Sequence, residues 1–264
     1  MKQTTIFLFL FLFSFCTTTS YSQTFYYSAP EAIEEDDYEL AFDNVVSKND
    51  YCKMAAQIEN ISLDFIMVKE KEIVYKGGEI EQKAGKKTFI IYPGKKKTKT
   101  FAFTDKGDYN QQEFSLDFDG LYLIPSDGEK TKAPSFNLPA SDNQITFGDF
   151  EVRLKGLKKE TKETIATFEV TYKGREIGLV KPSNLVAVFT GRGGAGHANA
   201  NKNTATKLLE RGDKCVIKAV FRISAKEGDM QFVPMQIIWK DTFQTTKKEK
   251  MDGQKVDFEF ERKR

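Results

Sequence analysis

The sequence is poor in the residues that build most metal and acid–base sites. Its 264 residues include one histidine, three cysteines and one tryptophan. A single histidine excludes every mechanism that needs two, including zinc proteases of the HExxH type and three-histidine zinc centres. Three cysteines are too few for a disulfide scaffold. We therefore expect no catalytic residues, no metal site and no cofactor, and we predict that the protein is not an enzyme.

The chain also lacks an excess of charge of either sign. It has 40 Lys and Arg against 38 Asp and Glu, a net charge of +2. Because nucleic-acid-binding domains usually carry a clear basic excess, we expect no nucleic-acid partner. The one long apolar run, residues 6–15, is too short to cross a bilayer, which takes about 20 helical residues. No later segment is longer, so we expect no transmembrane segment in the mature chain.

The amino terminus has the three parts of an export signal. Met1-Lys2 supplies a positive charge, the apolar run follows, and Ser20-Tyr21-Ser22 fits a small-x-small cleavage site. This pattern predicts a signal peptide over residues 1–22 and a periplasmic or extracellular protein. An uncleaved anchor is one alternative. A lipoprotein is another because of Cys16, although Phe15 stands where a small residue should precede a lipidated cysteine.

Alternation of apolar and polar residues dominates the rest of the chain. It is clearest over residues 114–118 and 256–260, and it is typical of strands with one buried face. Asp119-Gly120 and Asp252-Gly253 lie beside these runs, and Asp-Gly is a favoured hairpin dipeptide. No long stretch shows a clear helical period. The sequence predicts an all-β protein of antiparallel sheets.

A weak internal similarity indicates two tandem copies of one β unit. Tyr38-Glu39-Leu40 matches Phe150-Glu151-Val152, and residues 55–60 match residues 166–171. Between the copies, residues 125–143 contain three of the seven prolines among Ser, Asp, Lys and Asn. This composition is typical of a linker.

The size and strand rhythm of each copy predict an immunoglobulin-like β-sandwich. We expect an acidic segment over 23–37, a first sandwich over 38–124, the linker over 125–143 and a second sandwich over 144–264. Sheets closed into small barrels are the alternative architecture.

Three features resemble secreted bacterial immunoglobulin-like domains of unassigned function. They are the aromatic-Glu-aliphatic opening strand, a second strand that ends near Asn60 or Thr171, and a Gly/Lys turn before residues 215–221. The resemblance covers most of the mature chain. The first copy lacks the long Gly/Asn loop of the second, and neither copy has a Cys-Trp-Cys core. The resemblance implies a binding or spacer module and names no ligand.

Residues 191–196 form a literal G-x-G-x-x-G. The sequence after it is a poor helix start and no βαβ unit surrounds it, so a dinucleotide site is not expected. We interpret residues 191–203 as a long loop between two strands, where binding residues often lie. Its candidate ligand contacts are Arg192, His197, Asn199 and Asn201.

Lysines crowd residues 83–99, where Lys95, Lys96 and Lys97 are adjacent. They form a candidate basic patch for a polyanion, although lysine also protects exposed sheet edges against pairing. Cys52 and Cys215 fall in different predicted domains, which leaves two buried thiols or one inter-domain disulfide. We expect Trp239 to lie in a core.

These observations predict an exported, non-catalytic binding or structural module. Its partner would be an unknown protein or glycan of the cell envelope or the extracellular space. Two alternatives remain from the sequence: a secreted enzyme of unrecognised type, and a polyanion-binding surface protein that uses Lys83 to Lys99.

Overall fold

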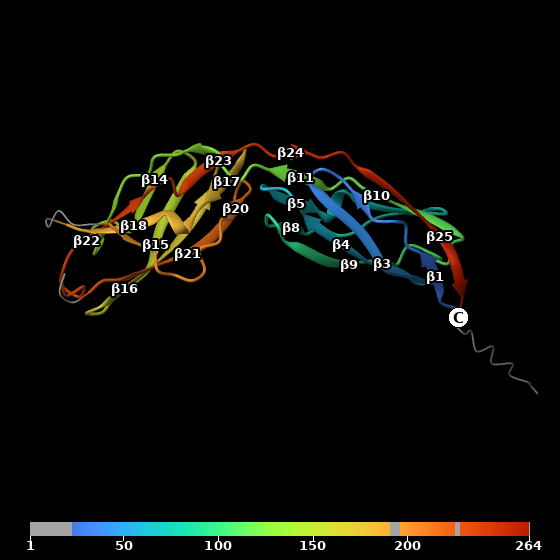
Figure 1. The fold of residues 1–264 in the computed structure, drawn as a ribbon, viewed down its shortest axis with the longest axis horizontal. Helices are drawn as coiled ribbons and strands as arrows, with labels where there is room; N and C mark the ends of the chain where they lie inside the picture. The colour runs from blue at the N-terminus through green and yellow to red at the C-terminus, as the bar shows by residue number, and fades with distance from the viewer. Residues whose placement is uncertain (1–22, 191–195, 225–227, 264) are drawn as a thin grey trace, which may run out of the picture.

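The computed structural model describes residues 23–190, 196–224 and 228–263. The predicted signal peptide, residues 1–22, lies outside this range. The described chain is all-β and antiparallel, apart from two single-turn 3-10 helices, and forms two sandwich-like lobes end to end (Figure 1). Within the described residues, no helix is long and apolar enough to cross a membrane.

The first lobe contains two sheets. The larger has the order β7-β6-β10-β25-β1-β3-β4-β9, with β2 beside β3, and the smaller has the order β24-β11-β5-β8. A 3-10 turn, Glu70–Glu72, joins β5 to β6. Its strands are β1 (Phe25–Ser28), β2 (Ile33–Glu34), β3 (Tyr38–Lys48), β4 (Tyr51–Asn60), β5 (Phe65–Lys69), β6 (Ile73–Gly77), β7 (Ile80–Lys83), β8 (Thr88–Ile91), β9 (Lys96–Thr104), β10 (Glu113–Phe118), β11 (Leu121–Ile124), β24 (Glu249–Lys250) and β25 (Gln254–Lys263).

The second lobe contains three four-stranded sheets, β12-β23-β17-β20, β13-β22-β18-β19 and β14-β15-β16-β21. A 3-10 turn, Pro182–Asn184, joins β17 to β18. Its strands are β12 (Glu129–Lys130), β13 (Phe136–Leu138), β14 (Gln144–Phe147), β15 (Phe150–Lys159), β16 (Glu163–Tyr172), β17 (Ile177–Val180), β18 (Leu185–Phe189), β19 (His197–Ala198), β20 (Lys207–Leu209), β21 (Lys214–Arg222), β22 (Met235–Trp239) and β23 (Phe243–Thr246).

Alternating burial explains why these runs are strands. Phe114, Leu116 and Phe118 on β10 are buried in the first core, as the sequence pattern predicts. Every second residue of β16 is buried in the same way in the second lobe. Each lobe has its own apolar core, and Trp239 lies in that of the second lobe, as expected.

The two lobes share one order of strand pairing. β3-β4-β9 is matched by β15-β16-β21, and β11-β5-β8 is matched by β23-β17-β20. The register pairs Tyr38 with Asn60 and Phe150 with Tyr172, so Asn60 and Tyr172 take equivalent places. The sequence match of 55–60 with 166–171 was therefore wrong by one residue. In a strand, that slip moves every side chain to the opposite face.

The strand pairing differs from the predicted division of the chain in three places. The acidic segment contains β1, whose Phe25 and Tyr27 are buried in the first core. The predicted linker contains β12 and β13, whose Phe136 and Leu138 are buried in the second core. The last residues of the predicted second sandwich form β24 and β25, which pair with strands of the first lobe.

Two arms therefore cross between the lobes in opposite directions (Figure 1). After β11 the chain enters the second lobe, where β12 pairs with β23 and β13 with β22. After β23 it returns to the first lobe, where β24 pairs with β11 and β25 with β10. Each arm begins with a Glu-Lys pair, Glu129-Lys130 or Glu249-Lys250. The place of β12 beside β23 in the second lobe thus corresponds to the place of β24 beside β11 in the first lobe.

The return of β25 predicts a large effect from Phe258→Ala. The ring is buried in the first core, 4.8 Å from Phe114 and 5.3 Å from Phe42 between centroids. Its loss should lower the free energy of unfolding by about 3–5 kcal/mol through lost burial and a cavity. Urea denaturation measures this, with exposed Glu261→Ala on the same strand as control, which should change it by less than about 0.5 kcal/mol. Equal effects of the two substitutions would contradict the placement of β25.

Candidate functional site

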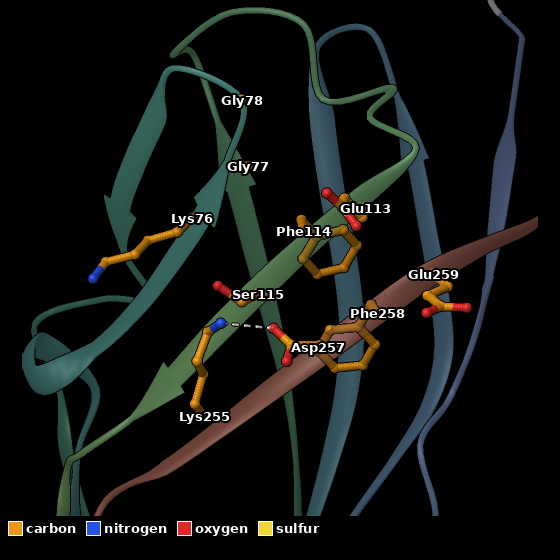
Figure 2. Close-up of a pocket in the computed structure, with 10 residues that line it drawn as sticks. All are labelled: Lys76, Gly77, Gly78, Glu113, Phe114, Ser115, Lys255, Asp257, Phe258 and Glu259. Atoms are coloured by element: carbon orange, nitrogen blue, oxygen red, sulfur yellow. Dashed lines mark ion pairs between the residues drawn. The ribbon is translucent and has the colours of Figure 1, made fainter.

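A shallow groove of about 470 Å³ lies on the outer face of β6, β10 and β25 (Figure 2). Cross-strand register sets its composition, because Ser115 on the central strand lies opposite Lys76 on one side and Asp257 on the other. The rings of Phe114 and Phe258 stack 4.8 Å apart and belong to the core. Polar side chains thus line the groove above a rigid apolar base.

The groove carries charges of both signs. Lys76 Nζ lies 2.6 Å from Asp117 Oδ2, and the hydrogen bond between them raises the pKa of Lys76. Lys255 Nζ lies 3.2 Å from Asp257 Oδ1, the pair joined by the dashed line in Figure 2. Because Lys76 stays a cation at neutral pH, the groove is suited to holding polar or charged groups and Lys76 does not serve as a base.

One end of the groove has an excess of negative charge. Glu113 on β10 lies directly opposite Glu259 on β25. Both are exposed, and in the described part of the chain neither has an ion-pair partner. Like charges directly opposite each other weaken a strand pair. This pair could not be predicted from the sequence, because it exists only through the return of β25 to the first lobe.

The predicted ligand loop is only partly within the described residues. Arg192 lies outside them. His197 is on β19, paired with β18, and its ring centroid is 5.8 Å from that of Phe189. Asn199 Oδ1 accepts a hydrogen bond from Val220 N at 2.9 Å, and Asn201 Nδ2 donates to Lys218 O at 2.8 Å.

These two asparagines, Asn199 and Asn201, bind the backbone of β21 through their side-chain amides. They satisfy backbone groups along β21, on the side away from β16. Asn199 Nδ2 also donates to Pro182 O at 3.0 Å, and so ties the start of β18 to β21. Their amides are therefore engaged by the protein's own backbone, which protects this sheet edge.

The predicted basic patch is partly neutralised by neighbouring residues. Lys95, Lys96 and Lys97 are all exposed at the start of β9. Lys96 Nζ lies 3.3 Å from Glu59 Oε2, and Lys97 Nζ lies 4.6 Å from the centre of the Phe89 ring. Lys99 Nζ lies 2.9 Å from Glu70 Oε1. The patch therefore has fewer uncompensated charges than the sequence indicates.

The two cysteines are free and lie in different lobes, Cys52 on β4 and Cys215 on β21. The inter-domain disulfide that the sequence left open is therefore wrong. Burial raises the pKa of both thiols, that of Cys215 to about 11. A protonated thiol is a poor nucleophile, so Cys215 lacks the activation that covalent catalysis requires.

An apolar cluster fills the junction between the lobes. Phe65 and Met67 on β5 and Ile177 and Leu179 on β17 are buried in it together with Ile124. Ile66 and Val68, on the opposite face of β5, are buried in the first core. A strand of a two-layer sandwich normally has one solvated face, whereas β5 has none. Each lobe therefore covers the outer face of a sheet of the other lobe, as a third layer of the sandwich would.

A polar network borders this cluster. Glu210 Oε1 lies 2.7 Å from Lys69 Nζ and 2.8 Å from Lys248 Nζ. The ring of Tyr122 lies 5.2 Å from Lys69 Nζ, and Tyr122 donates a hydrogen bond to Glu72 at 2.5 Å. One carboxylate thus connects a lysine of β5 with a lysine between β23 and β24.

Burial and hydrogen bonding together set the pKa values of this network. It lowers the pKa of Lys69, whose side chain is only 8% exposed, and Glu210 opposes that effect. Burial also works against the Glu210 carboxylate. The hydrogen bonds from Lys248 and Lys69 outweigh it and hold the pKa of Glu210 below its ordinary value. The Glu210 carboxylate is therefore the group that makes a buried lysine tolerable at the junction.

Comparison with known proteins identifies no family for this chain. No family model and no curated protein matches it. Among solved structures, red sea bream transglutaminase is similar to 72% of this chain and 27% of its own length, with 8% identity and a TM-score of 0.19. The chain thus spans about a quarter of that protein, and a likeness of this degree carries no argument about fold or function.

The residues of the junction were not predicted from the sequence, although their segments carry a pattern that indicates burial on both faces. The segments Phe65–Lys69 and Ile177–Val180 are almost continuously apolar and do not alternate. Such runs are typical of strands buried on both faces. In an antiparallel sandwich they indicate a third layer, and both belong to strands that face the other lobe.

Glu210→Gln should destabilise the protein at neutral pH and have no effect in acid. The carboxamide leaves Lys69 without its counter-charge, at a cost of about 2 kcal/mol at pH 7. Because the folded pKa of Glu210 is lowered, its contribution is present above its unfolded pKa and is lost as the pH falls through the folded value. Urea denaturation of both proteins at pH 7 and at about pH 2.5 measures this. A difference that is the same at both values would contradict it, and exposed Glu249→Gln is the control.

Cys215 should react slowly with iodoacetamide at neutral pH. Because its pKa is raised to about 11, the labelling rate should rise about tenfold per pH unit from pH 7 to pH 10 without a plateau. Mass spectrometry of the native protein measures this, and Cys215→Ser confirms the labelled position. A plateau below about pH 8 would instead show an activated thiolate.

Proposed function

We propose that the protein is an exported, non-catalytic binding or structural module, built from two immunoglobulin-like sandwiches and acting in the periplasm or outside the cell. The observation that carries the proposal is the junction. Two lobes in one chain usually meet through a small polar interface and move relative to one another. Here they share a buried apolar cluster and are crossed by two arms.

A fixed junction is useful to a module that presents surfaces. It keeps the groove of the first lobe and the loops of the second at a constant spacing, so less order is lost when both meet a partner. Residues 25 and 263 are neighbours on β1 and β25, and the second lobe extends away from that end (Figure 1). The shared order of strand pairing supports the interpretation of two related units.

The proposal is tested by capture of partners from cell-envelope extract. One bait is residues 23–264, and the second carries Met67→Ser with Leu179→Ser, which places hydroxyls in the buried junction. A partner that needs both lobes in fixed orientation should be retained by the first bait and lost from the second. Val216→Ser makes a similar change at an exposed position on β21 and should retain it. Equal capture by all three baits, or by none, would contradict the proposal.

A further inference from the structure

One strand makes the large sheet of the first lobe continuous. β1 pairs with β25 on one side, where Tyr27 lies opposite Phe260. On the other side it pairs with β3, where Tyr26 lies opposite Val46 and Phe25 opposite Ser47. Without β1 this sheet would separate into one part that ends at β25 and another that ends at β3.

The second lobe shows that separated arrangement. β13 takes the place of β25 beside β22, and β15 takes the place of β3 beside β16. They lie in different sheets. Among the residues that the structure describes, no strand pairs with β13 on the side away from β22, and none pairs with residues 156–159 of β15 on the side away from β16. The described part of the second lobe therefore has no counterpart of β1.

Apolar surface lies along this open edge. Leu154 and Leu157 of β15 are only half-buried against the second core. A side chain at Gly156 would meet no atom within 4 Å, so the face of the strand is open at this residue. Phe232 is 79% exposed, and the neighbouring Val233 accepts a hydrogen bond from Lys159 Nζ at 2.9 Å. That bond places the 232–233 turn against the end of β15.

The first lobe shows what this position can hold. Lys158 and Lys159 are equivalent to Val46 and Ser47, the residues of β3 with which β1 pairs. On β1 itself, Phe25 and Tyr27 point into the core and alternate with less buried residues. Tyr27 also donates a hydrogen bond at 2.8 Å to the carbonyl oxygen of Gln111, just before β10. The equivalent segment before β22 contains Phe232.

We propose that the unpaired edge of β15 at residues 156–159 is a strand-docking site, which takes an extended segment of a partner protein with apolar side chains at alternate positions. It rests on the proposed binding role and gives that role a place and a kind of partner. Added strands gain backbone hydrogen bonds at the sheet edge, and pockets for alternate side chains give specificity.

The sequence of β1 supplies the probe. A fluorescent peptide of residues 23–30, QTFYYSAP, is titrated with the full chain and followed by anisotropy. The matched control peptide has serine in place of Phe25 and Tyr27. We expect saturable binding of the first peptide and none of the second up to about 1 mM, the range of weak recognition. Absence of binding by the first peptide would overturn the proposal.

Protein variants and hydrogen exchange locate the bound peptide. Phe232→Ser removes an exposed ring, so the fold should be retained while affinity falls at least about fivefold. Val216→Ser is the control and should bind as the unaltered chain does. Bound peptide should slow amide exchange at residues 156–159. Slowed exchange at residues 46–47 instead, or equal affinity of Phe232→Ser, would overturn the proposal.

This assay is independent of the experiment on the junction. It uses purified protein with an intact junction and contains no envelope extract. Failure of the peptide to bind would remove the docking site and leave the rigid two-lobe module untouched. Failure of the capture experiment would remove the rigid module, whereas peptide binding at β15 would still be measurable.

Discussion

The apolar contact between β5 and β17 is the interaction on which the rest of the molecule depends. Each strand has one face in its own core and the other in the shared cluster, so neither lobe can be solvated at that surface without exposing several large side chains. Burial of this kind contributes about 25 cal/mol for each Å² removed from water. The Glu210 network lies at the border of the cluster and supplies the counter-charge of buried Lys69.

The crossing arms add a constraint of a different kind. The first lobe is complete only when residues 249–263 have returned to it, so its largest sheet includes strands from both ends of the described chain. Pairing of β1 with β25 closes a loop of more than 200 residues, and contacts of such separation slow folding. The same exchange means that the lobes are joined by two chain segments as well as by packing.

The sequence was sufficient to predict where strands lie but insufficient to predict which strands pair. Alternation located β10 and β25, because a half-buried strand needs a period of two. The same pattern carries no information about which lobe a strand joins, so β25 was assigned to the wrong one. Because prolines lie on both sides of Phe136 and Leu138, the composition predicted a linker where the structure has a buried strand. At the loop, Asn199 and Asn201 have the polarity expected of ligand contacts, but the fold brings them to the backbone of β21. Glu113 and Glu259 are neighbours only through that same return of the chain.

The most direct test of a fixed junction is the relative orientation of the lobes in solution. Residual dipolar couplings of the backbone amides, measured on residues 23–264 in a dilute aligning medium, report this orientation. The account predicts that couplings from both lobes fit one alignment tensor with the orientation of the structure. Two tensors of different magnitude would show that the lobes move independently, and would contradict the central role given to the cluster between β5 and β17.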